Sequence, residues 1–367
     1  AFPGFRPENA VNATRSAIAA YADLEFNFSP AFLIDIAGRF ENYNDFGSTV
    51  NGKLAMRYKV GNNFAIRGSV STGFRAPSLH QRYLSTTSTL FVAGVPYEVG
   101  TFPNDSRPAQ LLGIPSLRPE KSKNVSAGFT GNFGNFKVTL DGYYIRINDR
   151  IVYTDLFQGN SSPSAPAVDQ EIYRLLANAN ANRAQFFANA INTETKGIDL
   201  VVAYGIRIGS GNFRADLSGN ITETQQVGAV KASELLKGKE NIYFSESSRL
   251  FLERSVPRQK VGLTLTYGIS RFNFFVRNVW FGEVTEATNV VAAQQVYGAK
   301  VVTDVSVGYK LTDNIRISVG SNNLLDVYPD ETLDPATRTS NQFIYSRRAT
   351  QFGYNGRYVF GRIELTL

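Results

Sequence analysis

Few residues in this 367-residue sequence have the types and spacing that catalysis or metal binding requires. The chain has no cysteine, which excludes disulfides, thiolate metal sites and a cysteine nucleophile. Its single histidine, His80, cannot supply a histidine pair for a metal, and no partners for a Ser-His-Asp triad surround it. Glu120 and Asp149 could imitate a glycosidase pair, but their sequence settings are ordinary. Residues 131–134 (GNFG) indicate a hairpin turn, since no helical pattern follows them. We therefore expect neither an enzyme nor a bound cofactor or metal.

The charge of the chain favours anionic partners. It carries 38 Lys and Arg against 31 Asp and Glu, a net charge of +7. No segment concentrates these basic residues, so we expect no nucleic acid partner. No apolar run reaches the roughly 18 residues of a membrane-spanning helix. The sequence is still compatible with a transmembrane β-barrel, because such a barrel hides its apolar surface in an alternating pattern.

Alternating apolar and polar residues fill most of the chain. Apolar side chains recur at every second position from Ile198 to Ile208, and the stretches that begin at Phe213 and Val261 repeat the pattern. Turn signals such as residues 209–212 (GSGN) separate these stretches, as expected for hairpins. Strands of roughly 9–13 residues exceed the ~5–6 typical of soluble proteins and suit the ~9–11 needed to cross a bilayer at a tilt. The pattern therefore favours an outer-membrane barrel over a soluble sandwich.

The connections and the aromatic residues support this interpretation. Short turns alternate with long loops, which is the asymmetry of an outer-membrane barrel with short periplasmic turns and long extracellular loops. Many aromatic residues cluster near the short turns, where a membrane interface would place them. The long extracellular loops are expected at residues 75–119, 148–195, 225–257 and 326–354.

The strand count is odd. One strand is expected at 16–28, followed by six hairpin pairs. The pairs are 30–43 with 48–60, 63–73 with 121–133, 135–147 with 196–208, 212–224 with 258–269, 271–284 with 299–311, and 314–325 with 355–367. Single-chain bacterial barrels have an even number of strands, and an unpaired edge is costly in lipid. We therefore expect residues 1–367 to be the C-terminal part of a larger barrel, with residues 1–15 a remnant of an extracellular loop.

Several stretches resemble motifs of the TonB-dependent outer-membrane receptors. Residues 71–79 (STGFRAPSL) resemble a signature of that family, and residues 116–122 (SLRPEKS) resemble its L-x-PE-x-S element. Residues 141–151 (DGYYIRINDRI) are similar to its D-x-Y-x-I-x-I-x-D-x-I segment. Residues 322–329 (NNLLDVYP) resemble its N-N-L-F-D-x-x-Y element, with a leucine in place of the usual aromatic. The alternating end, residues 356–367, resembles the assembly signal of such barrels, with a terminal leucine in place of the usual aromatic.

The resemblance implies an all-β fold: an antiparallel transmembrane β-barrel in the outer membrane of a Gram-negative bacterium. About 13 C-terminal strands of a barrel of ~22 would lie in this chain, and the plug domain would not. Implied partners are the TonB energy-transducing complex, the plug domain of the same polypeptide, and outer-membrane lipid with lipopolysaccharide; a surface lipoprotein stays open. The implied function is active import of a scarce nutrient. The favoured cargo is a ferric siderophore or similar chelate, and the alternative cargoes are haem, cobalamin, oligosaccharide and peptide. The alternatives are a passive porin-like or structural barrel within a surface complex, and a secreted β-rich binding protein or enzyme.

Candidate ligand-binding residues fall into three groups. Arg39 and Arg67 are expected to face the lumen, where they either meet an anionic ligand or join a ladder of ion pairs. Arg75 is expected at the rim, where it either braces neighbouring strands or touches ligand. Aromatic residues of the long loops either stack on ligand or pack the loops together. These aromatic candidates are Tyr83, Phe91, Tyr97, Phe102, Phe157 and Tyr173. A short helix is expected from Asp169 to Leu176.

Overall fold

A computed structural model describes residues 7–92, 94–178, 182–335, 338 and 342–366. Its main feature is one 13-stranded antiparallel sheet in which every strand pairs with the next main-sheet strand along the chain. The strands are β1 (Ala17–Ser29), β2 (Phe32–Tyr43), β3 (Gly47–Val60), β4 (Phe64–Arg75), β7 (Glu120–Phe133), β8 (Phe136–Tyr153), β11 (Phe187–Ile208), β12 (Gly211–Val227), β13 (Gln259–Ile269), β14 (Phe272–Phe281), β17 (Lys300–Lys310), β18 (Ile315–Asn322) and β19 (Tyr358–Leu365). The predicted number and pairing of the strands are confirmed.

Two strands extend by six residues or more beyond their predicted bounds. β8 continues to Tyr153 and β11 begins at Phe187, so the expected loop 148–195 is much shorter than predicted. The register between these strands shifts twice, between Asn189 and Ile191 and between Ile191 and Thr193. A shift of this kind inserts an unpaired residue and interrupts the alternation, which explains why the sequence pattern ended early.

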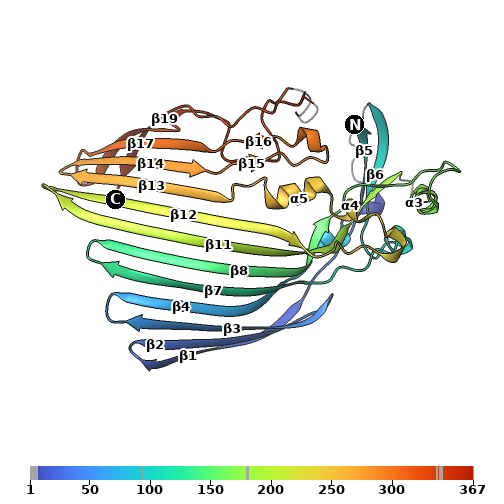
Figure 1. The fold of residues 1–367 in the computed structure, drawn as a ribbon, viewed down its shortest axis with the longest axis horizontal. Coiled ribbons are helices and arrows are strands. Elements are labelled where there is room, and N and C mark those ends of the chain that lie inside the picture. The colour runs from blue at the N-terminus through green and yellow to red at the C-terminus, as the bar shows by residue number, and fades with distance from the viewer. Residues whose placement is uncertain (1–6, 93, 179–181, 336–337, 339–341, 367) are drawn as a thin grey trace.

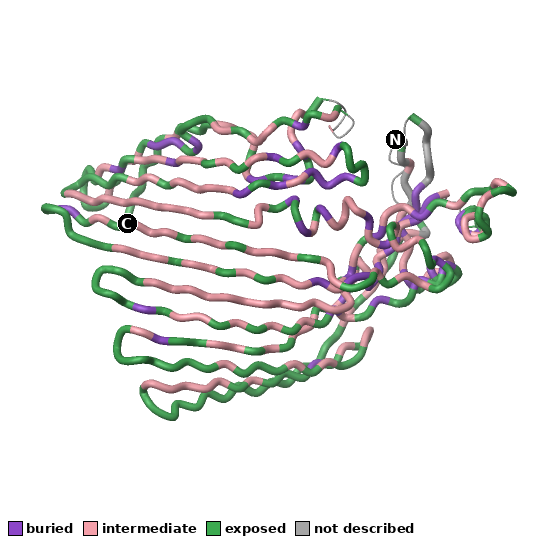
Figure 2. The backbone as a smooth tube through the Cα atoms, viewed as in Figure 1, coloured by how far each residue is buried: buried purple, intermediate pink, exposed green. Residues whose placement is uncertain are grey.

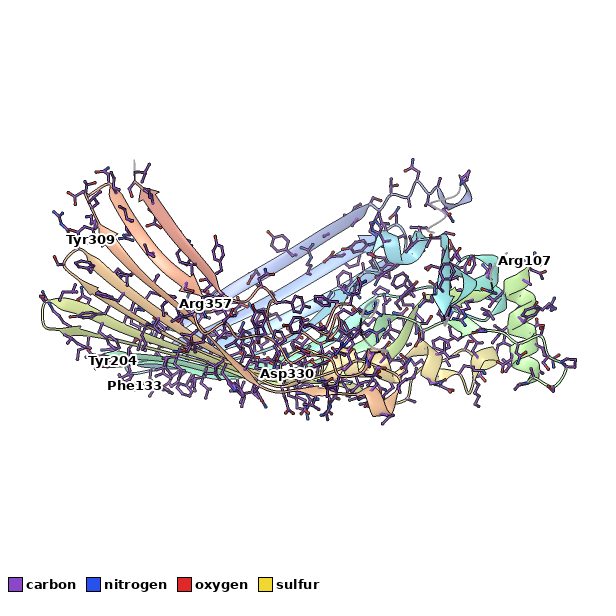
Figure 3. The ribbon with its side chains drawn as sticks, turned by 90° about the horizontal axis from the view of Figure 1, so that it is seen from above. Arg107, Phe133, Tyr204, Tyr309, Asp330 and Arg357 are labelled. Atoms are coloured by element: carbon purple, nitrogen blue, oxygen red, sulfur yellow. The ribbon has the colours of Figure 1, made fainter. Side chains whose placement is uncertain are left out.

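The sheet curves into an open trough. Seen from above, β1–β4 rise on one side and β17–β19 on the other, with the middle strands forming the floor (Figure 3). Short turns lie together at one end and the long connections at the other (Figure 1). β1 and β19 form the two edges of the sheet and do not pair with each other among the described residues.

The two faces of the sheet differ in polarity. Ile198 lies opposite Ile221, and Val202 opposite Leu217, so the register gathers the apolar side chains on one face. Ile198 stays 53% exposed and Ile221 56%, and the middle of the sheet shows almost no buried residues (Figure 2). An apolar face that no protein covers is suited to lipid, and the polar face then lines the lumen. Among the described helices, none is long and apolar enough to cross a membrane.

The long connections fold into a layer at the loop end of the sheet (Figure 1). Its helices are α1 (Leu79–Tyr83), α2 (Arg107–Leu111), α3 (Ala167–Ala177), α4 (Glu240–Tyr243) and α5 (Glu246–Glu253), with 3-10 turns η1 (Pro7–Asn9), η2 (Glu234–Leu236) and η3 (Val291–Ala293). Its small sheets are β5 (Thr86–Val92), β6 (Val95–Thr101), β10 (Arg183–Gln185) and β9 (Phe157–Gln158), and the pair β15 (Val284–Thr285) and β16 (Val296–Tyr297). The predicted helix from Asp169 to Leu176 is confirmed as α3.

This layer has its own apolar core. Three connections, those between β4 and β7, β8 and β11, and β12 and β13, contribute buried side chains to one cluster. Leu112, Phe157, Leu176 and Leu236 are all fully buried in it. The loops are therefore a packed unit, and its core also includes Ala188, Ala190 and Ile191 from the start of β11.

Candidate functional site

Arg75 closes a clamp at the loop end of three strands. Its Nε donates to Glu120 Oε2 at 2.7 Å, and Glu120 Oε1 accepts the backbone N–H of Ile151 at 2.7 Å. Glu120 is 5% exposed, so this carboxylate ties β4, β7 and β8 together out of water. Arg75 therefore braces the rim, which is one of the two roles expected for it. Both carboxylate oxygens of Glu120 are used in structural hydrogen bonds.

Asp304 organises a second clamp farther along the sheet. Its carboxylate accepts Arg277 Nε at 2.9 Å and the backbone N–H of Asn323 at 2.8 Å. Asn323 adopts a positive φ and holds Val327 through both its amide nitrogen and its amide oxygen. Asparagine tolerates that backbone conformation better than most residues. The NNLLDVYP stretch is thus a structural turn where β18 ends.

The two predicted lumenal arginines both lie in ion pairs on the polar face. Arg67 donates from Nε to Asp141 Oδ1 at 2.9 Å, and Arg39 pairs with Glu41. The bridge from β4 to β8 passes over β7 at Gly128, where a Cβ atom would overlap the carboxylate of Asp141. These contacts match the ion-pair ladder that was one of the two expectations for the lumenal charges.

The loop aromatics divide into packed and exposed rings. Phe157 is fully buried, and Phe102 packs against Phe186 with ring centroids 6.2 Å apart, so both hold the loops together. Tyr173 is 43% exposed on α3, and Phe91 is 59% exposed on β5. The ring of Tyr83 lies under the guanidinium of Arg82, and the side chain of Tyr97 lies outside the described part of the structure.

A cleft of about 890 Å³ opens at the loop end of β8 and β11, next to α5. Its wall is formed by the end of β8, the start of α5 and the loop that follows β15. Asn289 joins two of these walls, since it donates to Asp155 at 3.1 Å and accepts the backbone N–H of Ser247 at 2.8 Å. Ser245 caps the N-terminus of α5. The lining residues that matter chemically are Arg150, Tyr153, Phe244, Ser248, Phe251 and Arg348.

The cleft holds two guanidinium groups and one carboxylate, that of Asp155, which accepts a hydrogen bond from Asn289. Arg150 donates to Thr193 Oγ1 at 3.2 Å and makes no ion pair with the described carboxylates. Arg348 donates to the carbonyl oxygen of Ala287 and likewise has no carboxylate partner in the described structure. The rings of Phe244 and Phe251 line the same space. Apolar walls with a few convergent charged groups are typical of small-molecule sites, and here those groups favour an anionic ligand.

Of the nine predicted candidates, the eight whose side chains the structure describes do not line the cleft. Arg150 falls within the motif stretch 141–151, but sequence reasoning placed it in a loop rather than at the end of a strand. Arg348 and Phe244 come from two different connections, and no local pattern relates them. Only the folded loop layer brings the three together. Elsewhere in the described residues, no group of three or more His, Asp or Glu side chains could hold a metal ion.

The helix beside the cleft is stabilised by its own charges. Arg249 donates to Glu246 Oε2 and to Glu253 Oε2, both at 2.9 Å. The hydrogen bond from Arg249 lowers the pKa of Glu246. α5 therefore leaves neither carboxylate free to repel an anion at neutral pH.

An open-edged sheet of long strands, with an uncovered apolar face, a polar lumenal face and a folded loop layer, defines an outer-membrane β-barrel wall. The sequence model described as "TonB dependent receptor-like, beta-barrel" matches residues 1–324, and the chain belongs to this family. The family comprises receptors and transporters rather than enzymes, and its barrels lie in the outer membrane of Gram-negative bacteria.

Solved structures agree on the fold. The siderophore receptor PirA from Acinetobacter baumannii is 15% identical with a TM-score of 0.63, covering 96% of this chain and 46% of that one. A variant of the ferric enterobactin receptor PfeA from Pseudomonas aeruginosa is 14% identical with a TM-score of 0.65, covering 100% of this chain and 47% of that one. The vitamin B12 transporter BtuB of Vibrio cholerae is 24% identical over 139 residues, 38% of this chain and 18% of that protein. The chain thus spans about half the length of these receptor structures.

Proposed function

We propose that this chain forms the wall and extracellular loops of a receptor that imports a scarce nutrient across the outer membrane. The cargo is an anionic ferric siderophore or a similar metal chelate. The observation that carries the proposal is the cleft with Arg150 and Arg348, neither of which forms an ion pair with a carboxylate of the described residues. The family membership supports a receptor, and the siderophore receptors among the similar structures support the cargo class.

The proposal includes the partners that such transport needs. The unpaired edges of β1 and β19 each pair with a further strand of the complete barrel, since bare backbone groups cost several kcal/mol each in lipid. A plug domain of the same polypeptide fills the lumen and contacts TonB, which supplies the energy for import. The ion pairs of the polar face, such as Arg67 with Asp141, form the wall against which this plug rests.

Binding of two chelates of different charge tests the cargo class. The full-length receptor is titrated with an anionic ferric tris-catecholate and with a neutral ferric trihydroxamate. The double variant Arg150→Gln and Arg348→Gln is expected to bind the anionic chelate at least about tenfold more weakly, because losing a hydrogen bond to a charged group costs about 1.5 kcal/mol or more. The matched control is Arg107→Gln with Arg174→Gln, which removes two charges from helices α2 and α3 of the same loop layer. Undiminished binding in the double variant would contradict the assignment of the cleft.

Energy coupling is tested separately by uptake. Import of the bound chelate into cells is expected to stop when TonB is deleted, while surface binding persists. Equal uptake without TonB would favour the passive porin-like alternative.

A further inference from the structure

The cleft beside α5 contains a carboxylate that no cation of the described structure neutralises. Asp155 lies between β8 and β9 and lines the cleft. Its Oδ2 accepts the amide of Asn289 at 3.1 Å and its Oδ1 accepts the backbone N–H of Leu156 at 3.2 Å, and no described Lys or Arg forms an ion pair with it. An ionised carboxylate can accept about four hydrogen bonds. Asp155 therefore keeps the capacity to accept a further donor from a ligand.

The backbone around Asp155 fixes the position of this carboxylate. The N–H of Asp155 donates to the carbonyl oxygen of Ile242 in α4 at 2.7 Å. Thr154 and Phe157, which flank it, are 1% and 0% exposed. A group that is already held in place loses little conformational entropy when a ligand binds.

A chain of hydrogen bonds keeps Asp155 apart from the guanidinium group of Arg348. Asn289 donates to Asp155 and accepts the backbone N–H of Ser247. Ser247 Oγ in turn accepts Nη1 of Arg348 at 3.4 Å. The two opposite charges therefore lie at the two ends of this chain and do not pair with each other. Opposite charges that are held apart in one cleft suit a ligand that carries both signs.

The remaining groups of the cleft fit such a ligand. Arg150 and Arg348 outnumber the single carboxylate, so the ligand that matches the cleft has a net negative charge and one positive group. The rings of Phe244 and Phe251 line the same space, and the faces of aromatic rings attract ammonium groups. Water is partly excluded from a cleft of this kind, which strengthens a hydrogen bond between an ammonium group and a carboxylate.

We propose that Asp155 makes the cleft selective for chelates that carry a protonated amine in addition to their anionic groups. This inference rests on the proposed function, because it concerns the cargo of the same cleft. The ammonium group donates to the free lone pairs of Asp155, while Arg150 and Arg348 bind the anionic groups. A chelate without the amine leaves Asp155 without a donor and brings negative charge towards it, and both effects weaken binding.

Two chelates that differ only at the amine test this selectivity. The full-length receptor is titrated at pH 7 with a ferric tris-catecholate that carries one primary amine, which is protonated at this pH, and with the same chelate after N-acetylation. The wild type is expected to bind the amine form at least about tenfold more tightly, as for one hydrogen bond between charged groups. Equal binding of the two chelates by the wild type would overturn the inference, and this comparison needs no variant to fold.

The variant Asp155→Asn removes the charge and keeps an oxygen that can accept the amide of Asn289. It should lose the preference for the amine form, and it should bind the acetylated chelate at least as tightly as the wild type does. The matched control is Asp105→Asn, an exposed position of the same loop layer outside the cleft, which should keep the wild-type preference. An undiminished preference in Asp155→Asn would show that another group recognises the amine.

The double arginine variant separates this inference from the proposed function. If Arg150→Gln with Arg348→Gln weakens binding of both chelates while the wild type does not distinguish them, only the role of Asp155 is wrong. If the double variant binds both chelates as tightly as the wild type does, the assignment of the cleft is wrong, and the inference falls with it.

Discussion

Two buried carboxylates make the same kind of structural hydrogen bonds at different places on the rim. Glu120 and Asp304 each accept hydrogen bonds from an arginine of a neighbouring strand and from one backbone N–H, that of Ile151 on β8 and of Asn323 just after β18 respectively. Both are less than 10% exposed, so each carboxylate is satisfied without water. A charged acceptor strengthens such hydrogen bonds, which makes these clamps effective at fixing where strands end and loops begin. Three family-like motifs, which contain Arg75, Glu120 and Asn323, coincide with these clamps, whereas the stretch 141–151 also reaches the cleft through Arg150.

Gly128 provides a test of the lumenal ladder. In Gly128→Ala the new Cβ would overlap Asp141 Oδ1 and the carbonyl oxygen of Leu140, so the bridge to Arg67 must shift. We expect a loss of about 1–3 kcal/mol, as for overpacked sites. Thermal unfolding of the full-length barrel measures it. The control is Gly205→Ala on the same face, where the added Cβ meets no atom within 4 Å. Equal melting temperatures for the two variants would contradict the role of Gly128.

Asp45 links three segments of the loop end through two arginines. Arg15 reaches it at 2.6 Å and Arg82 at 2.9 Å, and the carboxylate is 7% exposed. Burial alone would raise the pKa of Asp45, but the hydrogen bonds and charges of the two arginines outweigh it and lower that pKa. A lowered pKa means that the stabilisation is complete above the ordinary aspartate value of about 4 and is lost as the pH falls through the lowered value.

We therefore expect segment 77–85, which holds Arg82, to loosen in acid. Hydrogen exchange of this segment, normalised to the unstructured-chain rate at each pH, should show lower protection at pH 3 than at pH 6. Asp45→Asn should show the low protection already at pH 6, whereas Asp105→Asn, an exposed site in the same connection, should not. Protection that is independent of pH in the wild type would refute this.

At the scale of elements, the sequence was sufficient for the strands and insufficient for the loops. Period-two alternation and turn residues determined the number, order and pairing of the strands, because each hairpin is a local feature. The loop-end parts of β8 and β11 were not predicted as strands, because register shifts around Asn189 and Ile191 break the period-two alternation. The burial of Phe157 was not predicted, because the rings that pack against it, Tyr243 and Phe186, come from other parts of the loop layer. Aromatic residues in loops look alike in sequence whether they pack or bind.

The loop core gives a prediction at this scale. Phe157→Ala removes a fully buried ring from the cluster that joins three connections, and such truncations cost about 3–5 kcal/mol. Hydrogen exchange should increase across residues 153–187 while the membrane-spanning part of β11 and β12 stays protected. Tyr173→Ala, at an exposed position on α3, serves as the control and should leave exchange unchanged. Loss of protection in the spanning strands would show that the loops and the sheet are not independent units.

For the whole molecule, every functional assignment depends on which face of the sheet meets lipid. The register places Leu200, Leu217 and Leu263 on the apolar face, and their chain neighbours Val201, Ser218 and Thr264 on the other. Because the chain has no cysteine, single substitutions such as Leu217→Cys and Ser218→Cys carry a spin label at one position only. In the full-length receptor in lipid, labels at the three leucine positions should collide with oxygen, which concentrates in hydrocarbon, and be shielded from a water-soluble nickel chelate. Labels at the neighbouring positions should show low oxygen collision, because they face the plug or water. If the leucine positions were open to the nickel chelate, the apolar face would not contact acyl chains, and the sheet would not be the wall of an outer-membrane barrel.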